Sequence, residues 1–218
     1  MKKFCFKSFA VAVFAALFAN PSGVLFAQQK EVALKKKPFD LSNIIRVPNI
    51  RQATDYTCCV ASFQSVLAYY GIELREDELA KELKADPKEG VMTPEVRKAA
   101  LARGLKADRK TDASLADLKK ALDEKKPTLL LIQAWPSDKA VDYAKDWDDG
   151  HCVIGVGYDE KNLYIMDPSV IGRYAYIPLD EFLVRWHDFD GPEKVHNLMM
   201  PIYGLEPQYL PEEPVRSE

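Results

Sequence analysis

The spacing of hydrophobic residues changes near the middle of the chain, from helical intervals to short apolar runs. Four segments of the first half have the helical spacing, and the predicted helices cover residues 58–70, 76–83, 93–104 and 114–125. Gly71 suits a left-handed cap after the first helix. Thr93 and Pro94 are expected to be the N-cap and the first helical residue of the third.

Short apolar runs in the second half predict strands. They cover residues 128–132, 152–158, 163–166 and 173–177, with a turn at 159–162. A short helix is expected next, with Phe182, Leu183 and Trp186 on it. Because the helices precede clustered strands rather than alternating with them, the pattern indicates an α+β fold.

The two ends of the chain differ from this central part. Lysines precede an apolar run near the N-terminus, which predicts a signal peptide over 1–27 with cleavage after Ala27; an uncleaved anchor is the alternative. A polar leader is expected over 28–43, the folded domain over 44–203 and a mobile tail over 204–218. The protein is therefore expected to be exported, to the periplasm or outside the cell.

Composition narrows the function classes. A length of 218 residues suits one domain with a sizeable core. The net charge of -3 gives no strong positive field, so we expect no nucleic-acid partner. A hydrophobic content of 47% with 29% charged residues is ordinary for a globular protein, so we expect no integral membrane domain after signal removal. Cys58, Cys59 and Cys152 would remain in the mature chain. An odd number of cysteines in an oxidising compartment leaves at least one without an internal partner.

Cys58 is the best candidate for a reactive thiol. It lies at the start of the first predicted helix, where the partial positive charge of the helix favours a thiolate. Helical phase predicts that Cys59 faces the core, whereas Cys58 shares its side with small and polar residues that could border a cleft. The two sets are Cys59, Phe63, Val66 and Tyr70, and Cys58, Ser62, Ser65 and Tyr69.

A thiol nucleophile needs a base, and the chain has three histidines. His151 opens a predicted strand, and two glycines on the same face of that strand leave room for something to approach. His187 and His196 lie beside a helix end and in a late strand, without comparable surroundings. Cys152 falls on the opposite, apolar face of the His151 strand, so we expect it to be packing material.

Residues in a fixed order along the chain resemble one family of cysteine peptidases. They are Gln52, Ala61, Leu67, Tyr69, Tyr70, Gly71, Gly150, His151, Val156, Gly157, Tyr158, Asp167 and Pro168. The combination, from about Val47 to about Trp186, is similar to the bacteriocin-leader peptidases, the thirty-ninth family of cysteine peptidases, which process double-glycine leaders.

The resemblance implies a stand-alone, secreted, papain-like cysteine peptidase that acts on a peptide or protein substrate and needs no cofactor or metal. Carried over by position, Cys58 is the nucleophile, His151 the base and Asp167 the carboxylate that orients the base. Gln52 is the oxyanion donor. The roles fit the chemistry, because attack by a thiolate on a carbonyl creates an oxyanion that an amide N–H stabilises.

Two departures from the family pattern keep other functions open. Cys59 stands where a glycine usually follows the nucleophile, which favours as one alternative a binding module with weak or no turnover. The chain also lacks the nucleotide-binding loop of a transporter, so double-glycine substrates are not implied. A third possibility is an amidase or acyltransferase. Cys58 could instead pair with Cys59 or Cys152, or join both and His151 in a zinc site.

Strand parity sets a condition on Asp167. With a regular even hairpin between the strand of His151 and the next strand, odd-numbered residues of one share a face with even-numbered residues of the other, and Asp167 would point away from His151. We therefore predict an odd-length connection or a β-bulge that returns Asp167 to the face of His151.

Overall fold

The structure is a computed structural model that describes residues 43–138 and 140–211. The predicted signal peptide and leader, up to residue 42, lie outside the described residues, as does the tail from 212 onward. Within the described part of the chain, no helix combines the length and the hydropathy that crossing a membrane requires.

Five helices and eight strands make up the described part, and the predicted α+β class is confirmed. The helices are α2 (Cys58–Tyr69), α3 (Glu76–Glu82), α4 (Thr93–Ala102), α5 (Leu115–Asp123) and α6 (Leu179–Arg185). The strands are β1 (Lys106–Ala107), β2 (Thr128–Gln133), β3 (Gly150–Tyr158), β4 (Asn162–Met166), β5 (Ala175–Pro178), β6 (His187–Asp190), β7 (Glu193–His196) and β8 (Met199–Tyr203). Each predicted helix and strand is present, with ends that differ by at most two residues.

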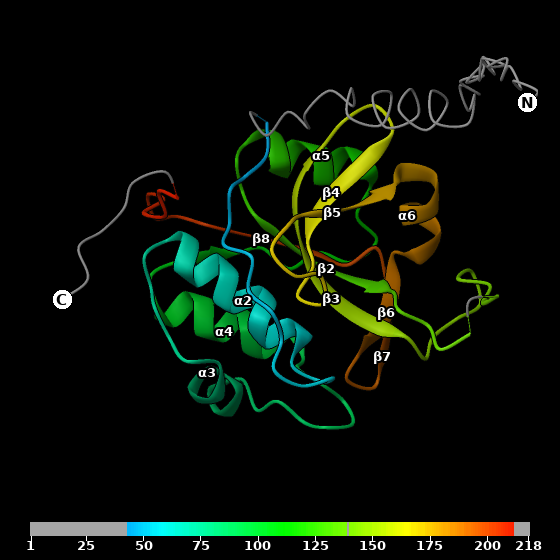
Figure 1. Ribbon diagram of the computed structural model, residues 1–218, viewed down its shortest axis with the longest axis horizontal. Coiled ribbons are helices and arrows are strands. Elements are labelled where there is room, and N and C mark those ends of the chain that lie inside the picture. Colours follow the sequence, from blue (N-terminus) through cyan, green and yellow to red (C-terminus); the bar gives the residue numbers. More distant parts are fainter. Residues whose placement is uncertain (1–42, 139, 212–218) are drawn as a thin grey trace, which may run out of the picture. The chain divides into compact units, whose positions relative to one another are not determined.

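The strands form one large antiparallel sheet and one hairpin. The six-stranded sheet has the order β1-β8-β2-β3-β4-β5, and β6 pairs with β7 separately. Figure 1 shows α2, α3 and α4 grouped together, apart from α5 and α6. The strand β3 lies inside the sheet between β2 and β4, so its backbone is fixed on both sides.

Helix ends follow their local sequence with one exception. Gly71 adopts the left-handed conformation predicted for it after α2, with φ of 75°. Ser114 and Asp117 form a capping box at the start of α5. Thr93, however, is the first helical residue of α4 rather than its N-cap, which is Met92. The reason is that the Thr93 hydroxyl is used elsewhere, in a hydrogen bond to the buried carboxylate of Asp190.

The helix α2 is buried on more sides than the helical spacing of its residues predicted. Cys59 and Phe63 face the core as expected. Ser62 and Ser65 do not border a cleft, and that expectation is wrong, because both are completely buried. Their hydroxyls donate to main-chain carbonyls, Ser62 to Cys152 at 2.9 Å and Ser65 to Pro48 at 2.5 Å, so the polar atoms are satisfied without water.

The predicted bulge is present between β3 and β4. The pairing runs Ile154 with Met166 and Gly155 with Ile165, then shifts so that Gly157 pairs with Tyr164. The extra residue restores the parity that a regular hairpin would have lost. The room at Gly157 is filled by the protein itself, because a Cβ there would lie 2.7 Å from Cδ1 of Ile44.

The first part of the predicted tail packs on the domain. The backbone N–H groups of Gln208 and Tyr209 both donate to the carbonyl of Tyr69, at 2.9 and 3.2 Å. This carbonyl belongs to the last turn of α2, where helical partners run out. The tail therefore meets the domain at the C-terminus of the helix that begins with Cys58.

Candidate active site

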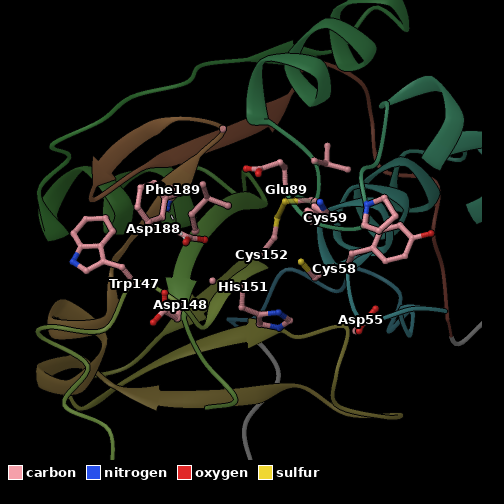
Figure 2. A pocket seen from close by; sticks show the side chains of 18 of the residues that line it. Asp55, Cys58, Cys59, Glu89, Trp147, Asp148, His151, Cys152, Asp188 and Phe189 are labelled. Carbon is pink, nitrogen blue, oxygen red and sulfur yellow. Dashed lines mark hydrogen bonds between the residues drawn. A yellow bond between two sulfur atoms is a disulfide. The ribbon is translucent and has the colours of Figure 1, made fainter. Parts of the chain in front are cut away.

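Cys58 and His151 line the same cavity. Cys58 is the first residue of α2 and the free cysteine of the described residues. His151 is the second residue of β3 and is buried. Both contribute to a cavity of about 540 Å³. Figure 2 shows the sulfur of Cys58 and the ring of His151 approaching one another from two sides of this cavity.

Asp167 lies against His151. Its Oδ1 is 2.8 Å from Nε2 of His151, which must donate because a carboxylate only accepts. The same carboxylate accepts a hydrogen bond from the backbone N–H of Ser169 at 2.8 Å and from Nε1 of Trp135 at 3.2 Å. Asp167 immediately follows β4, so the bulge between β3 and β4 is what brings this side chain to the His151 face.

These contacts shift the pKa values of His151 and Asp167 in opposite directions, and both shifts favour the charged form. Burial would lower the pKa of His151, but its hydrogen bonds to Asp167 and Cys58, together with their charges, outweigh burial and raise the pKa to about 9. Burial alone would raise the pKa of Asp167, yet the hydrogen bond and the charge of His151 lower it overall. An imidazolium facing a sulfur atom is the state in which a thiolate is stabilised.

Gln52 is close to this group but is not aimed at the cavity. Its Nε2 donates to the carbonyl of Thr54 at 2.8 Å, and its Oε1 accepts from the hydroxyl of Ser169 at 3.2 Å. The backbone N–H of Gln52 donates to the carbonyl of Pro168 at 3.1 Å, which ties its loop to the segment after Asp167. Gln52 lines a neighbouring cavity of about 310 Å³ instead. Its role as an oxyanion donor stays a prediction.

Cys59 and Cys152 form a disulfide, with their Cα atoms 5.0 Å apart. Cys152 is therefore not mere packing material, and that expectation is wrong. Helix phase and strand alternation placed each cysteine on a buried face but could not show that the faces meet. The bond removes both cysteines as zinc ligands and as partners of Cys58. It leaves Cys58 as the unpaired thiol that the odd count required.

A comparison with protein families identifies the chain. The model of the Peptidase_C39 like family matches residues 44–192. This chain belongs to that family. The matched segment of this C39-like protein contains Cys58, His151 and Asp167, the three residues that meet in the structure.

Solved structures agree on the fold. The C39-like domain is similar to a double glycine motif protease from an AMS/PCAT transporter in complex with the leader peptide, with 24% identity, a TM-score of 0.51 and coverage of 74% of this chain and 94% of the other. A C39-like peptidase structure from Bacillus anthracis is 21% identical, with a TM-score of 0.56 and coverage of 75% of this chain and 97% of the other. The peptidase domain of Streptococcus ComA, a bi-functional ABC transporter, is 19% identical, with a TM-score of 0.53 and coverage of 73% of this chain and 97% of the other. No curated protein matched the chain.

Two further residues of the C39-like site were not found by sequence reasoning. Trp135 follows β2, is 59% exposed and donates its indole N–H to Asp167, so it partly covers the His151–Asp167 contact. Asp188, on β6, is a buried acid that lines the Cys58 cavity. The sequence held one signal for Asp188, because Gly150 directly before His151 marks a place where another group approaches the backbone.

Proposed function

We propose that this C39-like protein is a cysteine peptidase in which Cys58, His151 and Asp167 act as a catalytic triad. The observation that carries the proposal is the meeting of an unpaired thiol at a helix start with a buried His151–Asp167 pair in one cavity. The family and the fold of its relatives support the same reading. The leader peptide bound to the AMS/PCAT relative supports a peptide as the substrate class.

The chemistry would proceed through an acyl-thioester. The Cys58 thiolate attacks the carbonyl carbon of the scissile bond, and the carbonyl oxygen becomes an oxyanion. His151 donates its proton to the leaving amine, while Asp167 holds the ring in position. Water, deprotonated by His151, then cleaves the thioester and releases the acid. The carboxylate of Asp167 stabilises the imidazolium before the amine leaves and again after His151 has taken the proton of water.

The oxyanion needs donors that lie near Cys58. The first N–H groups of a helix have no intrahelical partner, so the N–H of Cys58 at the start of α2 is one candidate. Gln52 is the second, and this role requires its amide to leave the carbonyl of Thr54 when substrate binds. Exchange of one hydrogen bond for a charge-assisted one favours that rotation.

The proposed site of action is an exported one. A disulfide between Cys59 and Cys152 supports this, because such bonds persist in the periplasm and outside the cell and are rare in the cytosol. The predicted signal peptide over 1–27 points the same way.

A binding module without turnover is the second candidate, and Cys59 next to the nucleophile is the observation that favours it. To separate the two, the purified protein is incubated with a thiol-reactive peptide analogue and with a random peptide library. We expect labelling of Cys58 and cleaved peptides, with neither in Cys58→Ala. Unlabelled Cys58 in the wild type would favour the binding module. Labelling without any cleavage would favour an amidase or acyltransferase.

A further inference from the structure

The cavity beside Cys58 contains a buried carboxyl group that the proposed chemistry does not use. Asp188 is 8% exposed and lines this cavity. Its Oδ1 accepts hydrogen bonds from the N–H of Phe189 at 2.8 Å and from Nε2 of Gln133 at 3.1 Å. Its Oδ2 has no hydrogen-bond partner among the described residues. Figure 2 shows Asp188 on the side of the cavity away from Cys58.

The backbone next to the proposed base is shaped around this carboxylate. A Cβ on Gly150 would lie 2.4 Å from Oδ1 and 2.6 Å from Oδ2 of Asp188, a distance that two atoms without a bond do not reach. Only glycine therefore allows the carboxylate to sit where it does. Gly150 directly precedes His151 on β3, so the Asp188 carboxylate packs against the backbone next to the proposed base.

Asp188 is held firmly in this place. Two residues further along β6, Asp190 accepts hydrogen bonds from the N–H of Thr93 at 2.8 Å and from Nη2 of Arg109 at 2.8 Å. At the other end of the strand, Nε2 of His187 lies 2.7 Å from the carbonyl of Asp146. The strand is anchored on both sides of Asp188, so its orientation is set by the fold rather than by a mobile loop.

His151 does not complete the hydrogen bonding of Asp188. One ring nitrogen of His151 is taken by Asp167 at 2.8 Å, and Cys58 is the other hydrogen-bonding partner of the ring. The open oxygen of Asp188 is therefore available to a donor from outside the described residues. Burial raises the pKa of Asp188 to about 7, and an incoming cation would stabilise its charged form.

The rest of the cavity wall also suits a cation. Of the charged residues that line the cavity, the acids are Asp55, Glu89, Asp148 and Asp188, and the cations in the described lining are Lys88 and the His151 imidazolium, so the acids outnumber the cations. The aromatic residues Trp147 and Phe189 form part of the wall. The ammonium of Lys194 lies 4.2 Å from the centre of the Trp147 ring and 5.2 Å from that of Phe189, so a lysine of the protein itself already uses this aromatic wall, and the acids carry the preference for a cation.

We propose that Asp188 pairs with a positively charged side chain of the substrate, so that the preferred substrates are peptides with lysine or arginine close to the cleaved bond. This inference rests on the proposed peptidase function. It commits to a cationic side chain because the carboxylate oxygen without a hydrogen-bond partner and the excess of acids in the lining both favour positive charge.

The cavity's charge preference is measurable at Cys58 without any turnover. Methanethiosulfonate reagents convert a thiolate to a mixed disulfide and release methanesulfinate, and they exist in cationic aminoethyl forms with a primary ammonium, neutral methyl forms and anionic sulfonate forms. The rate at Cys58 is followed by mass spectrometry of its peptide. We expect the cationic reagent to outpace the neutral one in the wild type, and the anionic reagent to be the slowest.

The variant Asp188→Asn keeps the shape of the side chain and removes its charge. We expect the cationic-to-neutral rate ratio to fall about 10- to 100-fold, the range for losing one charge-assisted hydrogen bond. Asp148→Asn removes an exposed charge from the same cavity and is the matched comparison, with a change of less than about threefold because exposed charges are screened. Equal effects of both variants would overturn recognition by Asp188 in favour of a diffuse field.

The design remains decisive if Asp188→Asn does not fold, since a wild type with no preference for the cationic reagent already refutes the inference. A peptide library then separates the two proposals. Cleavage of peptides without any preference for lysine or arginine would overturn the inference and leave the peptidase function intact. Absence of all cleavage would count against the peptidase function, and the reagent ratio would still decide whether the cavity selects a cation.

Discussion

Reduction of the Cys59–Cys152 disulfide should destabilise the domain strongly. The two cysteines are 93 residues apart, so the bond closes a long loop in the unfolded chain. Loop-closure entropy for that length corresponds to about 4.6 kcal/mol at 25 °C. A domain's whole free energy of unfolding is about 5–15 kcal/mol, so this single bond accounts for a large share of it.

The assay compares one protein in its oxidised and reduced forms. The variant Cys58→Ala prevents exchange between Cys58 and the disulfide, and urea unfolding is followed with and without a phosphine reductant. Both cysteines are at most 3% exposed, so the reduced thiols remain buried in the native state and the fold loses no side-chain atoms. We expect the free energy of unfolding to fall by roughly 4–5 kcal/mol. The m-value should rise, because the reduced chain unfolds to a more extended ensemble.

A loss below about 1 kcal/mol would refute the reasoning, because the loop-closure model would then fail for this domain. A matched control is the triple variant Cys58→Ala, Cys59→Ala, Cys152→Ala, which has no disulfide to reduce. Its stability should be the same with and without the reductant. Any change there would show that the reductant acts on something other than this bond.

Three other predictions test the site and its support. Asp167→Asn should lower kcat/KM by about 10²–10⁴-fold. Because the wild-type pKa of His151 is raised to about 9, activity of the wild type should decline near pH 9, and this decline should move to lower pH in the variant. A decline at the same pH in both proteins contradicts the role of Asp167. Gly150→Ala should lower the free energy of unfolding in urea by about 1–3 kcal/mol, because its Cβ would meet the Asp188 carboxylate at 2.4 Å. Combining Gly150→Ala with Asp188→Ser should recover part of that loss. Ser114→Ala should cost about 1 kcal/mol through the α5 capping box and leave kcat/KM unchanged; altered activity would mean that α5 influences the site.

Local pattern predicted those features of the fold that local chemistry determines. Helix α2 begins at Cys58 and is followed by a left-handed Gly71, as its sequence indicated. The bulge before Asp167 followed from parity together with the family resemblance, because the meeting of Asp167 with His151 that the resemblance implied was impossible in a regular hairpin. The helix arguments need only the helical period and the capping residues, which a single sequence contains.

Features that depend on two distant segments could not be predicted in the same way. The pairing of Cys59 with Cys152 requires α2 to cross β3 at one particular height, and no spacing encodes that height. The burial of Ser62 depends on a carbonyl acceptor at Cys152, 90 residues away. The direction of the Gln52 amide is set by Thr54 and Ser169, whose positions follow from loop geometry.

The disulfide also bears on the residue that follows the proposed nucleophile. A cysteine in place of the expected glycine raised the prospect of a side chain that crowds the oxyanion. Here the Cys59 sulfur is bonded to Cys152 and 3% of the residue is exposed, so the side chain is directed into the α2–β3 contact and cannot swing toward a bound carbonyl.

The same bond joins the residue after Cys58 to the residue after His151, so it ties together the two elements that must present sulfur and imidazole to one another. The Ser62 hydroxyl adds a second tie between these elements, at 2.9 Å from the Cys152 carbonyl. Displacement of reacting groups by about 1 Å can cost about 100-fold in rate. With Cys59 held in this bond, the departure from glycine is compatible with the proposed catalytic site, and labelling of Cys58 decides between that site and a binding module.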